Sequence, residues 1–254
     1  MKKRILIILF LIHSVIFAQN PQTTFHGIFE TNYNDPDYKY TNYNKFHFDG
    51  KGHVLINDTI SGIFIEDKNK LYIASQIQFF FFKIEPNKIV RFDEFDNNLN
   101  YFKKNQTQDS TLFDSSKVNA KLLYEYISYE YDLKNFESNL LMFTENETYL
   151  SKMQSLCKSG LDIACESYIE GIRMNQLRDA FANNTEFEFK QNTEIENICI
   201  LYAKFNPGKA YYQLSIYYAS IKNIEKAKHY FELTKQNADS FLTKQLIELE
   251  NIIK

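Results

Sequence analysis

The sequence predicts an α+β fold of two domains, in which an N-terminal antiparallel β-meander or partly closed barrel precedes an all-α part made of helical hairpins. Three observations predict this organisation. Residues 24–103 form short apolar or alternating segments separated by turn residues, which is typical of strands. Residues 104–116 are rich in Gln, Thr, Asp and Ser, which indicates a polar linker. Over 117–254 apolar residues recur at helical spacing.

The first eighteen residues are predicted to be a signal peptide, and they are excluded from the fold. Lys2, Lys3 and Arg4 form its charged start, the apolar run 5–17 follows, and the small residue Ala18 precedes the expected cleavage site. The apolar run is shorter than the roughly 20 residues that a membrane-spanning helix needs. We therefore expect an exported protein, periplasmic or secreted, with no stable membrane insertion after cleavage.

The charge of the chain argues against nucleic acid as a partner. The full sequence has 29 basic and 32 acidic residues and a formal net charge of −3. Loss of the three basic residues of the signal peptide leaves 26 basic residues against the same 32 acidic ones. Proteins that bind nucleic acid neutralise phosphates with Lys and Arg, so an acidic chain predicts a different partner.

The β domain is predicted from strand segments and the turns between them. The turn at 49–52 is the strongest signal, because its two glycines tolerate the positive φ of tight hairpins. Further reversals are expected at 67–70 and 85–88. The aromatic run 77–84 is typical of a strand that is covered on both faces. The expected result is a meander of about six to eight strands, rolled or partly closed to hide its edges.

The helices of the second domain are predicted from periodicity and end signals. Thr144 and Glu147 have the spacing of a capping box, in which a hydroxyl and a carboxylate satisfy the free amides at a helix start. The helix that begins there is expected to stop near Gly160. The other expected helices are 116–133, 162–182, 193–205, 208–221, 223–237 and 239–253.

An internal repeat connects two of the helical turns. Residues 156–164 align with 202–210, an offset of 46 residues, and in both copies one helix ends and the next begins with an alanine. The second copy resembles a tetratricopeptide repeat, because large and small residues have the spacing of that motif. The residues that carry the likeness are Tyr211, Leu214, Ser215, Tyr218, Ala227 and Phe231. The resemblance covers about 147–240 and implies a surface that binds other molecules.

The cysteines extend this resemblance. Cys157 and Cys165 look like the bridged pair of Sel1-like repeat proteins, so the resemblance implies a disulfide between them, although both copies lack the Leu-Gly pair of that family. Two helices joined by a tight turn bring such positions within the ~4.4–6.8 Å between Cα atoms that a disulfide requires. Two reduced, buried cysteines are the alternative. Cys199 lies on an apolar stripe, which favours core packing over a reactive thiol.

The start of the β domain resembles small lipocalin-like domains. Gly27 and Phe29, followed by the hairpin at 48–50, carry this likeness over about 80 residues. It is consistent with an alternative function, a carrier of small apolar ligands in which the aromatic residues 79–82 line a pocket.

Catalytic motifs do not emerge from the sequence. There is no GxSxG, P-loop, HExxH or GxGxxG pattern, so we predict a protein that is not an enzyme and has no cofactor and no metal. His26, His47 and His53, with Glu30 and Asp49 nearby, allow a metal or acid–base cluster to be drawn. Scattered histidines on solvated faces are the favoured interpretation.

The function predicted from the sequence is an exported, non-enzymatic binding or scaffold protein. Its short array of tetratricopeptide- or Sel1-like hairpins is expected to contact a peptide or protein partner. The candidate contact residues are Tyr212, Gln213, Ile216 and Tyr217 on the concave side of the first helix of the hairpin. The alternative is that these tyrosines pack on a neighbouring helix.

Overall fold

The computed structural model of the chain describes residues 21–32, 42–75, 78–92, 99–105, 113, 117–132, 137–138, 147–183 and 188–253. The predicted signal peptide, most of the predicted linker and Thr144 of the predicted capping box lie outside the described residues.

The β domain is a closed barrel of eight antiparallel strands in sequence order. The strands are β1 (His26–Thr31), β2 (Lys45–Asp49), β3 (His53–Ile56), β4 (Ile60–Asp67), β5 (Lys70–Ser75), β6 (Phe79–Glu85), β7 (Lys88–Arg91) and β8 (Asn100–Lys104). Each strand pairs with the next, and β8 closes the barrel on β1 with Phe29 opposite Lys103. The predicted meander is therefore fully closed, which removes the unpaired edges that an open sheet exposes.

Large aromatic side chains fill the inside of the barrel. The ring of Phe46 lies 5.0 Å from that of Phe82 and 5.1 Å from that of Tyr101, measured between centroids. All three side chains are fully buried. A barrel of eight strands is just wide enough to be filled by its own side chains, so the interior is a packed core.

Strand β6 is covered on both faces, as its aromatic run predicts. Phe80 and Phe82 belong to the barrel core, whereas Phe81 belongs to the core formed with the helices. Phe79 also packs against that second core, with its ring centroid 5.0 Å from that of Tyr131. The two faces of one strand therefore contribute to two separate cores.

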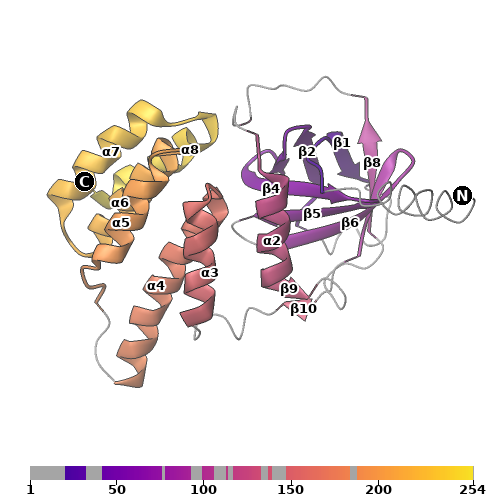
Figure 1. Cartoon of the computed structure of the whole chain (residues 1–254). Helices are drawn as coiled ribbons and strands as arrows, with labels where there is room; N and C mark the ends of the chain where they lie inside the picture. Colours follow the sequence, from indigo (N-terminus) through magenta and orange to yellow (C-terminus); the bar gives the residue numbers. More distant parts are fainter. Residues whose placement is uncertain are drawn as a thin grey trace, which may run out of the picture.

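Helix α2 (Ala120–Glu130) covers the outer face of the barrel next to β4 to β6 (Figure 1). Its apolar residues Leu123 and Ile127 pack with Tyr72 and Phe81 of the barrel. The helix ends earlier than the predicted 116–133, because Tyr131 is extended and pairs in the short two-stranded sheet of β9 (Tyr131–Asp132) and β10 (Glu137–Ser138).

The helical part follows α2 and lies on its far side from the barrel (Figure 1). It consists of α3 (Glu147–Lys158), α4 (Asp162–Ala182), α5 (Thr193–Tyr202), α6 (Pro207–Ser220), α7 (Ile224–Asn237) and α8 (Ser240–Ile253). Consecutive helices pack on one another, and their buried residues join α2 and the outer barrel face in one continuous core. None of the described helices combines the length and the apolar content that crossing a bilayer requires.

The two copies of the internal repeat have equivalent packing. Ala164 and Ala210, which lie in the first turn of the second helix of each copy, are both fully buried. Leu156 and Tyr202, which lie in the last turn of the first helix, are buried as well. The structure also joins Cys157 and Cys165 by a disulfide, with the Cα atoms 4.7 Å apart. The turns at 159–161 and 203–206 therefore lie in corresponding places.

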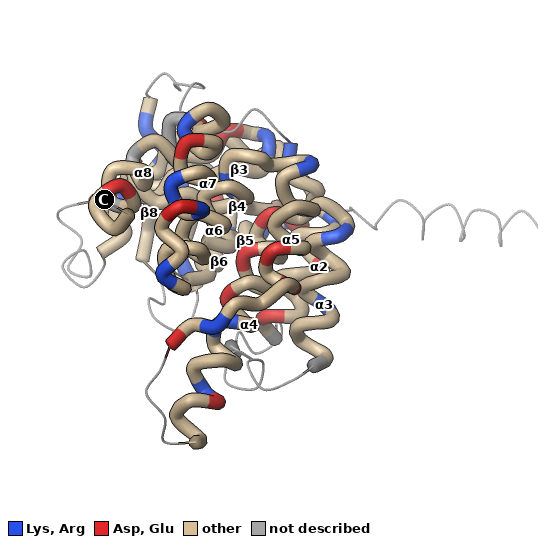
Figure 2. The backbone as a smooth tube through the Cα atoms, turned by 90° about the vertical axis from the view of Figure 1, so that its left-hand side faces the viewer, with Lys and Arg blue, Asp and Glu red and all other residues tan. Residues whose placement is uncertain are grey.

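The third cysteine, Cys199, is buried in the core of the helical part. Burial raises the pKa of the Cys199 thiol to about 12, and the nearby Glu196 carboxylate adds to the shift. A thiol with so high a pKa is a poor nucleophile at neutral pH. Figure 2 shows basic and acidic residues interspersed along the helical part.

Candidate functional site

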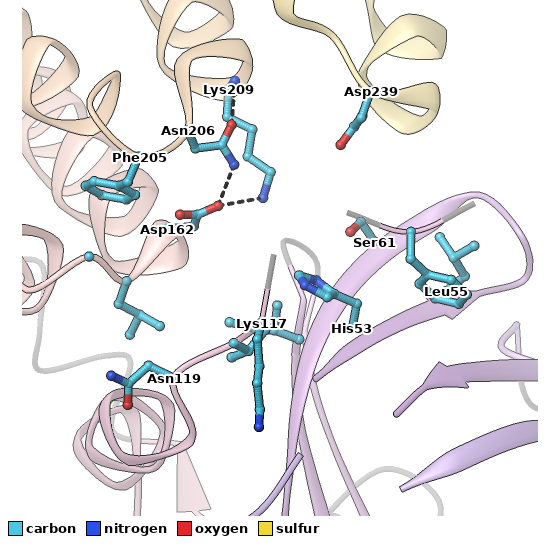
Figure 3. Close-up of a pocket in the computed structure, with 15 residues that line it drawn as sticks. His53, Leu55, Ser61, Lys117, Asn119, Asp162, Phe205, Asn206, Lys209 and Asp239 are labelled. Carbon is cyan, nitrogen blue, oxygen red and sulfur yellow. Dashed lines mark hydrogen bonds and ion pairs between the residues drawn. The ribbon is translucent and has the colours of Figure 1, made fainter. Parts of the chain in front are cut away.

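A cleft of about 250 Å³ lies where the barrel meets the turns of the helical part. Fifteen residues from distant parts of the sequence line it (Figure 3). They are His53, Leu55, Ser61, Ile63, Phe113, Lys117, Val118, Asn119, Gly160, Leu161, Asp162, Phe205, Asn206, Lys209 and Asp239. Among the described residues it is larger than a second hollow of about 30 Å³, which shares Ser61 and Asp162 with it.

The barrel side of the cleft is formed by the outward side chains of β3 and β4. His53 is opposite Ile63 in the strand register, and Leu55 is opposite Ser61. Val54 of β3 points into the barrel core, so its neighbours on the strand point outward by the alternation of a β-strand. The two cross-strand pairs therefore give this side of the cleft both polar and apolar side chains.

The helical side of the cleft is formed by helix starts. Leu161 and Asp162 lie at the start of α4, Asn206 and Lys209 at the start of α6, and Asp239 directly precedes α8. The first two of these turns are the equivalent turns of the internal repeat. Because α4, α6 and α8 begin at the same end of the helical part, these residues lie on one side of the molecule.

A short segment before α2 completes the cleft and is fixed to the barrel. The N–H of Val118 donates to the carbonyl of Lys51 at 3.1 Å, next to the β2–β3 turn. Gly52 in that turn has a φ of +109°, and a Cβ at this position would meet Val118 at 2.6 Å. The glycine therefore allows the segment to lie close against the turn. Asn119 then caps α2 by accepting from the N–H of Leu122 at 3.3 Å.

Some charges in the cleft are already neutralised. The Asp162 carboxylate accepts from Asn206 Nδ2 at 2.7 Å and lies 3.5 Å from Lys209 Nζ (Figure 3). Lys209 Nζ also lies 3.9 Å from Glu166, which in turn accepts from the Tyr202 hydroxyl at 3.1 Å. This network connects α4 to α6, and in it the single Lys209 ammonium is shared by the Asp162 and Glu166 carboxylates.

Two other charged residues and one aromatic ring line the cleft, and in Figure 3 the Lys117 side chain extends away from Asp239. Lys117 is exposed and forms no ion pair within the described part of the chain. The exposed Asp239 carboxylate points toward the cleft in Figure 3 and accepts from the N–H of Leu242 at 2.7 Å. Phe205 is 39% exposed although it is a large apolar residue. These three side chains are available to a bound molecule.

The three histidines of the sequence analysis do not form a metal site. His47 is buried with its ring 4.7 Å from that of Phe113, measured between centroids, and His53 lines the cleft. His26 is exposed, and its Nδ1 lies 3.4 Å from the carbonyl of Thr24. Among the described residues, no group of three His, Cys, Asp or Glu side chains could hold a metal ion.

The predicted contact residues on α6 have different surroundings. Tyr217 is only 2% exposed, and its hydroxyl accepts from the N–H of Asn192 at 2.6 Å. The structure therefore corrects the expectation that Tyr217 faces a partner, because its ring packs on neighbouring helices, which was the stated alternative. Tyr212, Gln213 and Ile216 are half-buried.

These three residues lie on the same face of α6 as Lys209 of the cleft. Positions 209, 212, 213 and 216 are three, four and seven residues apart, which is the spacing of one helical face. We call this row the α6 face. Lys209 lines the cleft, whereas Tyr212, Gln213 and Ile216 are not among its lining residues.

Most cleft residues were missed by the sequence analysis. Two of its turns had a detectable signal, because the repeat aligns Gly160 with Asn206 at helix starts. On the barrel side the sequence singled out only His53, as part of a possible histidine cluster, and nothing local relates His53 or Ser61 to the helices.

In comparisons with known proteins, no family model, no curated protein and no solved structure matches this chain.

Proposed function

We propose that this protein is an exported binding protein that holds a peptide segment of a partner protein in the cleft and along the α6 face. The observation that carries this proposal is the exposed ring of Phe205 on the rim of a cleft that also contains apolar side chains and open charges. An exposed apolar residue beside a concave, partly polar surface is typical of a binding site.

The helical hairpin of α6 and α7 supports a tetratricopeptide-like interpretation. Leu214 and Tyr218 of α6 are buried, as are Ala227 and Phe231 of α7. The Ser215 hydroxyl donates to the carbonyl of Ala227 at 2.8 Å, which requires a small residue at each position. Repeats of this kind form extended surfaces for peptides, and we propose that role for the α6 face.

Export is part of the proposal and is supported by two features. The predicted signal peptide would direct the chain to export. The Cys157–Cys165 disulfide is the kind of bond that persists in oxidising compartments. The disulfide closes the turn that contains Gly160 and Leu161, so it restrains one side of the cleft. A site restrained before binding loses less entropy when the ligand binds.

The alternative of a carrier for small apolar ligands receives less support from the barrel. Phe80 and Phe82 pack fully buried among the other side chains of the barrel core. The observations favour a ligand outside the barrel, and we therefore keep the cleft as the proposed site.

The proposal is tested by selection from a displayed library of random peptides on the immobilised mature protein. The dissociation constants of the selected peptides are then measured for the wild type, Phe205→Ala and Phe181→Ala. Phe181 is the matched control because it is also exposed, at 72%, but belongs to the far end of α4. We expect Phe205→Ala to weaken binding by about tenfold or more, as is common for an aromatic anchor, and Phe181→Ala to leave it unchanged.

Two results would contradict the proposal. Selection could yield no peptide that binds in solution, or the selected peptides could bind Phe205→Ala as well as the wild type. Melting temperatures of both variants serve as the control for folding, because a half-exposed ring contributes little to the core.

A further inference from the structure

The open charges of the cleft have opposite signs and come from different sides of it. Lys117 precedes α2 next to the barrel, whereas Asp239 precedes α8 in the helical part (Figure 3). Apolar side chains, among them Val118 and Leu161, line the cleft as well. A ligand that fits this surface carries an apolar group and one charge of each sign.

The ion pair of Asp162 and Lys209 in the same cleft shows why Lys117 and Asp239 are expected to select the charges of the ligand. The Lys209 ammonium already has the Asp162 and Glu166 carboxylates as partners. A ligand gains little from a charge that is already satisfied inside the protein. A charged ligand therefore gains most from Lys117 and Asp239, which have no ion pair among the described residues.

Local structure fixes the Asp239 carboxylate and the backbone next to Lys117. The Asp239 carboxylate is held by the N–H of Leu242, and it keeps further acceptor sites because an ionised carboxylate accepts about four hydrogen bonds. Lys117 lies beside the start of α2, a helix with no acidic residue in its first turn. The positive end of that helix also favours an acidic group at this place.

We infer that the ligand is an ampholytic peptide segment in which an apolar side chain lies between an acidic residue that contacts Lys117 and a basic residue that contacts Asp239. This inference rests on the proposed function and defines its ligand class. It differs from a general apolar-peptide site, because both charges of the ligand contribute.

The test uses short fluorescent peptides with blocked termini and a central Phe. One set has an acidic and a basic flanking residue, in both orders, and the others have only the acidic residue, only the basic residue, or Ser at both places. Titrations use the full mature protein at low and high salt. We expect one ampholytic peptide to bind about tenfold more tightly than the uncharged one at low salt, and the difference to fall at high salt.

Two charge-neutralising variants assign the contacts. Lys117→Gln is expected to lower affinity about threefold or more only for peptides with the acidic residue. Asp239→Asn is expected to do so only for peptides with the basic residue. Asn caps helices as well as Asp does, so α8 keeps its start. The matched controls Lys121→Gln and Glu225→Gln change the same charges at exposed positions outside the cleft and leave every affinity unchanged.

The possible failures are distinguishable. If all peptides bind the wild type equally and Phe205→Ala weakens them all, the ligand class is wrong and the proposed function stands. If an affinity gain from charge persists in both Lys117→Gln and Asp239→Asn, the assigned contacts are wrong. If no peptide binds, neither the charged nor the uncharged, the ligand class and the proposed function fail together.

Discussion

The barrel and the helical part bury their apolar side chains in different ways. The barrel core is enclosed by eight strands, whereas the core of the helical part reaches across α2 to the outer face of the barrel. The first is sealed by closure of the sheet, and the second depends on contacts between separate elements. The accessible hollow lies at the junction of the two regions, where the barrel supplies side chains of β3 and β4 and the helical turns supply charged and aromatic groups.

The largest expected loss of stability comes from a substitution inside the barrel core. Phe82→Ala removes a fully buried ring from the barrel core and is expected to lower the free energy of unfolding by about 3–5 kcal/mol. Phe102→Ala on the neighbouring outer surface, where the ring is exposed, is expected to cost less than about 1 kcal/mol. Urea unfolding of both variants measures the difference, and equal losses would contradict a filled barrel.

The next prediction concerns the joint between α2 and the helical part, where Glu130 is 2% exposed. Burial raises the pKa of the Glu130 carboxyl to about 7, and the hydrogen bond from the Tyr149 hydroxyl, at 2.9 Å, opposes part of this shift. The folded protein therefore retains this proton between pH 4.5 and about 7, whereas the unfolded chain loses it. Since the unfolded state binds fewer protons, stability falls as the pH rises through this range and then levels off.

Glu130→Gln removes this contribution. Relative to the wild type, the variant is expected to gain about 3 kcal/mol between pH 4.5 and pH 8, because each pKa unit corresponds to about 1.4 kcal/mol. Denaturant midpoints measured across that range test the expectation. A constant difference between variant and wild type at every pH would show that the carboxyl does not titrate in this window.

The disulfide is expected to affect the helical part more than the barrel. Reduction, or the double substitution Cys157→Ser and Cys165→Ser, is expected to lower the free energy of unfolding by about 2 kcal/mol, since the closed loop is short. Helical circular dichroism recorded during heating reports the loss, and peptide affinity is measured in parallel because the bond restrains Leu161. An unchanged melting curve under reduction would contradict this role.

The smallest expected effect concerns Tyr217. Tyr217→Phe removes the hydroxyl that accepts from the N–H of Asn192 and keeps the buried ring. The expected loss is about 1 kcal/mol, with no effect on peptide affinity, because the side chain lies inside the helical part. A large loss of peptide affinity without a loss of stability would show that Tyr217 contacts the peptide and would contradict this prediction.

The elements could be predicted from sequence more completely than their assembly. Periodicity located α4 at 162–182, and the turn residues located the hairpin at 49–52, because both signals lie within a few residues. Closure of the barrel depends on pairing between β1 and β8, such as Phe29 with Lys103, and no local pattern encodes a contact over that separation.

The cleft has the same long-range origin. Its residues range from His53 to Asp239 and meet only after the barrel, α2 and the helix starts pack together. The contact residues predicted on α6 were chosen from the spacing of one hairpin, and that spacing could not show that Tyr217 faces a neighbouring helix. Packing between elements determines both the composition of the cleft and the burial of Tyr217, and sequence periodicity does not describe that packing.

The most direct test of the proposed binding site is hydrogen–deuterium exchange of the protein without residues 1–18, with and without a selected peptide. We expect the peptide to slow exchange at 117–119, 160–162 and 205–216, because these segments form the cleft and the α6 face. Exchange at 174–183, in the far half of α4, is expected to stay unchanged. Protection confined to the far half of α4, or to barrel strands away from β3 and β4, would contradict a site at the junction.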